Sequence, residues 1–189
     1  MRIMFTAAAA LMVLAAAPAL ANEAVAVEVA AEALKPNKFV WNDPGTAEPV
    51  TVVVSIPLQR AYVYRGTALV AATAVSTGKP GDDTPTGIYP ILQKAVKHVS
   101  NLYGSSMPYM QRLTWDGIAL HAGANPGVPA SHGCVRLPTE FARRLFAITD
   151  VGTTVVVTDL AAVGTELDPE LLRTEEMRAN DAQLASLGQ

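Results

Sequence analysis

Between residues 50 and 158 the sequence is divided into short runs of β-branched and aromatic residues, separated by glycine, proline and polar residues. Such runs are typical of β-strands bounded by turns. The clearest candidates are residues 51–55, 61–64, 69–75 and 153–157. One helix is expected late in this region, because Pro138 suits a first helical position and Phe141 and Leu145 follow at helical spacing. Many short strands with a single inserted helix predict one mainly β domain of about 110 residues.

The first 21 residues have the pattern of a cleavable export signal. Arg2 provides a positive start, an uncharged alanine-rich stretch follows, and small residues around Ala21 form a cleavage site. A transmembrane anchor is the alternative interpretation, but Pro18 interrupts the stretch, and no later segment is long and apolar enough to span a bilayer. We therefore expect cleavage after Ala21, no remaining transmembrane anchor, and a location in the periplasm or cell envelope.

The segments on either side of the β-rich region carry weaker signals. Residues 22–49 are of low complexity and then rich in turn residues, so we predict a linker with little fixed structure. A short helix over residues 24–34 is the alternative, since alanine and glutamate are common there. Residues 159–189 are predicted to be an acidic helical segment or tail, which either packs on the domain or remains solvated.

The net charge excludes some classes of partner. The chain has 14 basic and 17 acidic side chains, and loss of Arg2 with the signal would leave 13 against 17, a net charge of −4. A mildly acidic protein without basic runs is a poor candidate for binding nucleic acid or anionic lipid.

Cys134 is the only cysteine of the chain and lies in the hexapeptide Ser-His-Gly-Cys-Val-Arg, residues 131–136. Exported proteins use structural cysteines in pairs, so a single one is an intermolecular link, an inert core residue or a reactive thiol. The polar loop around Cys134 and the two nearby histidines, His121 and His132, favour the reactive thiol.

A thiol attacks an acyl carbon efficiently only as a thiolate, which requires a base or a positive field. His121 could take the proton as general base, while Arg136 and the N-terminus of the expected helix supply positive charge. Consecutive backbone N–H groups around Gly133 and Cys134 could stabilise a developing oxyanion. These residues indicate acyl transfer by a cysteine nucleophile, and a thiol protease fits them as well.

A metal site made of His121, His132 and Cys134 is a further interpretation. His132 and Cys134 are only two positions apart and no fourth ligand lies nearby, whereas zinc motifs have wider or doubled pairs. We therefore expect no metal and no other cofactor, and we assign His132 to structuring the loop through hydrogen bonds.

The sequence also offers three aromatic residues that could contact a substrate. They either line a substrate groove or pack beneath a loop, and they are Tyr103, Tyr109 and Trp115.

The hexapeptide resembles the Ser-His-Gly-Cys-x-Arg signature of the L,D-transpeptidases, the YkuD-type catalytic domain of bacterial cell-wall enzymes. His121 stands upstream, where this family has its general base. Residues 84–89, Thr-Pro-Thr-Gly-Ile-Tyr, are similar to the family's Thr-Pro-x-Gly-x-aromatic segment, and residues 75–78, Val-Ser-Thr-Gly, resemble the strand end before it. The resemblance covers about residues 50–158.

The resemblance implies a β-sandwich-like L,D-transpeptidase catalytic domain with a short helix after the active-site cysteine. Cys134 would attack the carbonyl between the third and fourth residues of a peptidoglycan stem tetrapeptide and release D-alanine. An amine of a neighbouring stem peptide, which gives a 3→3 cross-link, or of an outer-membrane protein would then take the acyl group from the thioester. The family is typically inhibited by carbapenems, which acylate this cysteine.

The resemblance also implies roles for individual residues. His121 would act as general base and later as acid, with the backbone carbonyl of Ala122 orienting its ring. Gly133 and Cys134 would line the oxyanion hole, and Arg136 would orient substrate or brace the loop. The remaining candidates, for loop support and for substrate contact, are Ser131, His132, Tyr109 and Trp115.

Two other functions stay open. Water in place of the acceptor amine would make the same site a peptidoglycan L,D-carboxypeptidase or amide hydrolase. The second alternative function is that of a non-catalytic wall-binding module, and the intact pair of His121 and Cys134 argues against it.

The loop between His121 and Ser131 is short, since only ten positions separate the two residues. The glycines and prolines between them predict a stiff loop that influences the choice of acceptor.

Overall fold

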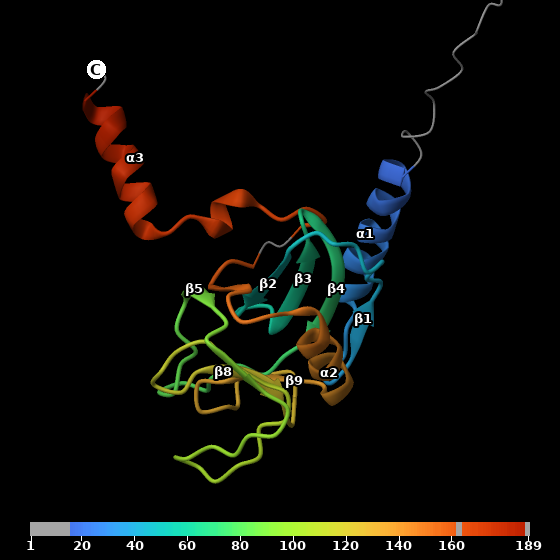
Figure 1. Cartoon of the computed structure of the whole chain (residues 1–189), viewed down its shortest axis with the longest axis vertical. Coiled ribbons are helices and arrows are strands. Elements are labelled where there is room, and N and C mark those ends of the chain that lie inside the picture. The colour runs from blue at the N-terminus through green and yellow to red at the C-terminus, as the bar shows by residue number, and fades with distance from the viewer. Residues whose placement is uncertain (1–15, 162–163, 188–189) are drawn as a thin grey trace, which may run out of the picture.

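The computed structural model describes residues 16–161 and 164–187, and its central element is a six-stranded sheet (Figure 1). In spatial order the strands are β1 (Phe39–Trp41), β4 (Ala68–Ala74), β3 (Arg60–Arg65), β2 (Val50–Ser55), β10 (Thr154–Thr158) and β5 (Gly87–Pro90). β2 and β10 are parallel, whereas the other neighbours are antiparallel. The four strands that the sequence predicts most clearly correspond to β2, β3, β4 and β10.

A second, four-stranded sheet carries most of the candidate catalytic residues. Its strands, in spatial order, are β6 (Gln93–Ala95), β7 (Met110–Arg112), β8 (Ala119–Ala122) and β9 (Val135–Leu137). The helix α2 (Thr139–Ile148) follows β9 and is the helix expected after the cysteine. Pro138 precedes its first residue instead of occupying it.

The main hydrophobic core lies between the two sheets and α2. Successive residues of β2 point to opposite faces, so Val52 and Val54 enter this core while Val53 faces the other side of the sheet. Phe141 of α2 is fully buried, and its ring meets those of Phe39 and Trp41 edge to face. Two sheets packed around one short helix confirm the predicted mainly β, β-sandwich-like class.

The expectation of little fixed structure over residues 22–49 is wrong. Helix α1 (Ala16–Glu32) packs with Ala24, Val27 and Ala31 against the face of the six-stranded sheet that is opposite to α2. These positions are three and four residues apart, so they form one apolar stripe along the helix. The helix that we gave as the alternative is therefore the observed structure, and β1 then extends the sheet by pairing with β4.

The C-terminal end of α1 is attached to β3. Arg60 donates hydrogen bonds to the carbonyl oxygen of Ala31, in the last turn of α1, and to that of Leu34, just beyond its end. Residues 1–15 of the expected signal lie outside the described residues, and residues 16–21 form the first part of α1. Cleavage after Ala21 stays a prediction, and it would retain all three buried positions of α1. None of the described helices has the length and hydropathy needed to cross a membrane.

The C-terminal segment divides into a packed part and an exposed part. Leu167 and Leu171 are buried in the same core as α1, and Leu171 belongs to the 3-10 turn η1 (Pro169–Leu172). Helix α3 (Glu175–Leu187) leads away from the domain (Figure 1), and its side chains from residue 176 to residue 186 are exposed.

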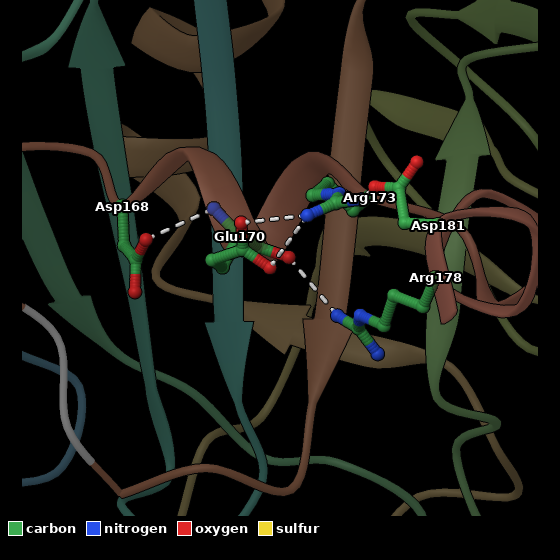
Figure 2. A network of polar contacts seen from close by, with 5 residues as sticks. All are labelled: Asp168, Glu170, Arg173, Arg178 and Asp181. Atoms are coloured by element: carbon green, nitrogen blue, oxygen red, sulfur yellow. Dashed lines mark hydrogen bonds and ion pairs between the residues drawn. The ribbon is translucent and has the colours of Figure 1, made fainter. Parts of the chain in front are cut away.

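Figure 2 shows the polar network that connects η1 to α3. Asp168 accepts the N–H of Glu170 at 2.9 Å, and Arg178 donates to the carbonyl oxygen of Glu170 at 2.9 Å. Arg173 forms ion pairs with Glu170 and with Asp181. These groups are largely exposed, so the network orients α3 more than it stabilises the domain.

Candidate active site

A cleft of about 630 Å³ opens on the second sheet, and both His121 and Cys134 line it. His121 lies on β8, and Cys134 is the residue before β9. Because β8 and β9 are parallel neighbours, with Leu120 opposite Val135, these two segments deliver their side chains to the same region. The other walls come mainly from residues 98–107 and 115–119.

The imidazole of His121 is held in one orientation. Its Nδ1 lies 2.8 Å from the carbonyl oxygen of Ala122, and since a carbonyl oxygen only accepts, Nδ1 carries the proton. Nε2 is then the nitrogen that can accept a proton. Burial lowers the pKa of His121 below its usual value, and the charge of Arg136 acts in the same direction, whereas the hydrogen bond with Ala122 opposes both. His121 is therefore neutral at neutral pH.

The thiol of Cys134 is partly buried among apolar side chains of the second sheet. Burial raises the pKa of Cys134, although a backbone hydrogen bond with Ala119 and the charges of Arg136 and Arg112 oppose the change. Its Sγ donates to the carbonyl oxygen of Gly117 at 3.4 Å. The resting site thus contains a neutral thiol and a neutral imidazole, not a preformed thiolate–imidazolium pair.

The expected contribution of the helix dipole does not fit the structure. Strand β9 separates Cys134 from α2, which begins at Thr139, and the field of a helix terminus fades within about one turn. The positive charge of the site comes instead from Arg136 and Arg112, which both line the cleft. Within residues 16–161 and 164–187, no carboxylate forms an ion pair with either guanidinium, so these charges are available to an anionic group.

Ser131 closes the loop before Cys134. Its Oγ accepts the N–H of Gly133 at 3.1 Å and donates to the carbonyl oxygen of Cys134. Gly133 has a φ of +103°, a backbone conformation that residues with a Cβ rarely adopt, so this position favours glycine. Because Ser131 already engages the Gly133 N–H, the expected pair of oxyanion donors does not fit, and the Cys134 N–H is the candidate that remains.

Segments distant in sequence support the same loop. Ser76 exchanges two backbone hydrogen bonds with Arg136, of 3.1 and 2.9 Å, and the carbonyl oxygen of Thr77 accepts the N–H of Ser131 at 3.0 Å. The buried side chain of Gln59 donates to the Thr77 hydroxyl at 2.7 Å and accepts the Thr77 N–H at 3.0 Å. Our sequence reasoning missed Gln59, because nothing in its neighbourhood in the chain shows that it reaches this loop.

Thr84 makes the most direct of these supports. Its Oγ1 accepts the N–H of Gly78 at 2.8 Å and lies 2.8 Å from the carbonyl oxygen of Gly133. The side chain is buried, and it does not line the cleft. The resemblance of residues 84–89 to a family segment pointed to this threonine, but the contact itself needs the tertiary structure.

The ring of His132 contacts two neighbouring segments of the chain. Its ring is exposed and stacks on that of Tyr103, with 4.5 Å between ring centroids, and its Nε2 lies 3.4 Å from the Nζ of Lys79. Ser131 makes side-chain hydrogen bonds within the loop, whereas the ring of His132 bonds to Lys79, whose backbone N–H donates to the carbonyl oxygen of Ser131 at 3.0 Å. The described residues contain no group of three or more side chains that could hold a metal ion.

The aromatic candidates have different positions. Trp115 is 74% exposed at the rim of the cleft, where Tyr103 also lies. Tyr109 lies outside the cleft and packs its ring against Phe146 of α2, with 5.9 Å between centroids. Tyr109 therefore packs against α2, which corresponds to the packing alternative given for it above. Its position outside the cleft does not agree with the expected role in substrate binding.

The short loop between His121 and Ser131 is braced against the first sheet. Asn125 is buried, donates from Nδ2 to the carbonyl oxygen of Ala74 at 2.6 Å, and accepts the N–H of Gly127 at 3.0 Å. These hydrogen bonds are consistent with the stiffness expected from its glycines and prolines.

Comparison with known proteins identifies a matching family. The family model of the YkuD L,D-transpeptidase catalytic domain matches residues 49–157, which include His121 and the hexapeptide. No curated protein matches the chain.

Similar folds occur among solved L,D-transpeptidases. The one from Stackebrandtia nassauensis is 30% identical, with a TM-score of 0.55, over 60% of this chain and 57% of that chain. One from Mycobacterium tuberculosis H37Rv is 28% identical, with a TM-score of 0.54, over 58% of this chain and 57% of that one. The LD transpeptidase LdtMt1 in complex with imipenem is 25% identical, with a TM-score of 0.57, over 60% of each chain.

The matching region thus spans less than two thirds of each of these solved chains. The family model, in contrast, covers more than half of the present chain, including all residues that line the cleft around His121 and Cys134. The chain belongs to the YkuD family of L,D-transpeptidase catalytic domains.

Proposed function

We propose that this protein is an exported cysteine transpeptidase that acts on peptidoglycan stem tetrapeptides. One observation carries the proposal: Cys134 and His121 line the same cleft, and Ala122 orients His121 so that Nε2 can accept a proton. Family membership suggests the substrate class, and the presence of imipenem in the similar LdtMt1 complex suggests a probe for the thiol.

In the first step His121 Nε2 takes the proton of the Cys134 thiol as Sγ attacks the carbonyl carbon of the third stem residue. The Cys134 N–H donates to the oxyanion that forms. When the tetrahedral intermediate collapses, the C–N bond to the fourth residue breaks and the imidazolium of His121 protonates the leaving amine. D-Alanine departs, and a thioester on Cys134 remains.

In the second step an acceptor amine attacks the thioester. His121 takes a proton from the amine, a new amide bond forms, and the thiol of Cys134 is restored. A neighbouring stem peptide as acceptor gives a 3→3 cross-link, and an outer-membrane protein gives an attached protein. The braced loop between His121 and Ser131 borders the cleft, and we infer that it influences which acceptor can approach.

Arg136 and Trp115 are the proposed substrate contacts. Arg136 carries a charge without an ion-pair partner in the described part of the chain, which suits a carboxylate of the stem peptide. Trp115 offers an exposed ring at the rim of the same cleft. The apolar, uncharged N-terminal stretch with small residues before Asn22 supports export to the periplasm or cell envelope, where this substrate occurs.

Analysis of muropeptides after incubation with tetrapeptide-bearing peptidoglycan tests the proposal. Dimers that lack a terminal D-alanine are expected from a transpeptidase. Tripeptide monomers without dimers would instead identify the carboxypeptidase alternative, in which water replaces the amine. Absence of both products would leave only a wall-binding role.

The Cys134→Ala variant is the matched control. It should remain folded, because alanine fills most of the partly buried site, and should form neither product. Intact mass after treatment with imipenem should show a single adduct on the wild type and none on this variant. Residual turnover by Cys134→Ala would refute the assignment of the nucleophile.

A further inference from the structure

Thr84 occupies a buried position in which its single hydroxyl has only one available orientation. The Gly78 N–H points at Oγ1, so the oxygen acts as acceptor in that hydrogen bond, of 2.8 Å. A hydroxyl has one proton to donate, and the other neighbour, the carbonyl oxygen of Gly133 at 2.8 Å, can only accept. The Thr84 proton is therefore directed at the Gly133 carbonyl.

Gly78 makes this approach possible. A Cβ on Gly78 would lie 1.9 Å from the carbonyl oxygen of Asp82 and 2.7 Å from the backbone nitrogen of Thr84, distances that no side chain tolerates. The backbone at Gly78 is thus packed directly against the backbone of residues 82–84. This main-chain contact determines the position of the Thr84 hydroxyl.

The peptide between Gly133 and Cys134 is trans, since the described residues contain no cis peptide bond. In a trans peptide the C=O and N–H groups point in opposite directions. Anchoring the Gly133 carbonyl on Thr84 therefore directs the Cys134 N–H away from the buried side of the loop. Cys134 lines the cleft and Thr84 does not, and in the described chain no protein acceptor is found for this N–H.

We propose that Thr84 is a positioning residue that aims the Cys134 N–H at the oxyanion of the acyl-transfer reaction. This inference rests on the proposed function. Thr84 does not touch the reacting atoms; it acts through the orientation of one peptide plane. With the Gly133 N–H engaged by Ser131, the Cys134 amide is the loop donor left for this purpose.

The test separates steps that need an oxyanion donor from steps that do not. Acylation by imipenem passes through a tetrahedral oxyanion, whereas alkylation by iodoacetamide is a direct displacement at carbon and forms none. In Thr84→Val, which keeps the shape of the side chain but removes the hydroxyl, we expect acylation to slow by about 10–10³-fold, up to the loss typical of one oxyanion donor. Alkylation of Cys134 should stay within about twofold of the wild type, since that reaction does not use the donor.

Two further variants complete the design. Thr84→Ser restores the hydroxyl and should recover most of the acylation rate. Thr86→Val removes a hydroxyl from an exposed position of the same segment and should behave as the wild type. Normal acylation of Thr84→Val would overturn the inference, and so would a parallel loss of acylation and alkylation, because that result would mean general damage to the loop.

Crystal structures of the wild type and Thr84→Val make the outcome independent of the proposed function. If imipenem does not acylate the wild type, the proposed function fails, and the orientation of the peptide decides the inference by itself. A rotated Gly133–Cys134 peptide in Thr84→Val supports the positioning role. An unchanged peptide in that variant refutes it.

Discussion

Replacing Val27 by alanine tests whether α1 is an integral part of the domain. Val27 is 1% exposed and lies on the side of α1 that packs against the six-stranded sheet. Val29 is 62% exposed, two positions further along the same helix. The two substitutions remove the same atoms from the same helix, so the difference between their effects isolates the contribution of burial.

The expected magnitude follows from the buried groups. Two methyl groups at about 0.8 kcal/mol each amount to about 1.6 kcal/mol. The cavity left behind adds to this, so Val27→Ala should lower the free energy of unfolding by roughly 1.5–3 kcal/mol. Alanine is the better helix former by up to about 0.7 kcal/mol. That gain applies to both variants, and Val29→Ala should therefore be neutral or slightly stabilising.

Thermal and urea unfolding of the chain that begins at Asn22 provides the assay. For a protein of this size each kcal/mol changes Tm by about 2–4 °C, so Val27→Ala should melt roughly 3–12 °C below the wild type. Equal stability of Val27→Ala and Val29→Ala would show that α1 is not packed on the sheet in solution. That result would support the original prediction that residues 22–49 form a linker.

Four further predictions concern the candidate site residues. His121→Ala should slow acylation by imipenem by about 10²–10⁴-fold, the usual loss for a general base; a near-normal rate would assign that role to another group. Burial raises the pKa of Cys134, so its thiolate forms at higher pH than that of a free cysteine. Alkylation by iodoacetamide should accordingly rise with a midpoint above about 8.5, and a lower midpoint would contradict the assigned environment. Trp115→Ala should raise KM for a stem tetrapeptide with little change in Tm, because the ring is exposed. Tyr109→Ala should lower Tm and leave KM unchanged, because its ring packs on α2; the reverse pattern would restore Tyr109 to the substrate site.

The strand-rich fold was accessible from the sequence because β-branched runs bounded by turns are local signals. A helix in the region of α1 was only the alternative to a linker, because its signal depends on tertiary packing. Its alanine-rich sequence has weak amphipathicity, and the stripe of Ala24, Val27 and Ala31 becomes significant only when the outer face of the sheet is present to cover it. The strand β1 is too short to be recognised without its partner β4.

The assignments within the cleft divide in the same way. The hexapeptide and His121 could be singled out because a lone thiol, two imidazoles and a guanidinium within sixteen positions form an unusual local pattern. The assignment of His132 to loop hydrogen bonds stays a prediction, because sequence proximity to Cys134 says nothing about where its ring points; the ring Nε2 lies 3.4 Å from the Nζ of Lys79. Its stacking on Tyr103 depends on a segment some thirty positions upstream.

Local patterns were thus sufficient for the class of fold and for proposing a nucleophile and its general base, since each of these depends on residue type and short-range spacing. The proposed oxyanion donor, the hydroxyl of Thr84 that contacts the Gly133 carbonyl and the position of Tyr109 outside the cleft were not accessible in this way. Each results from a contact between segments far apart in the chain, and hydrogen-bond geometry and burial exist only once those segments are packed together.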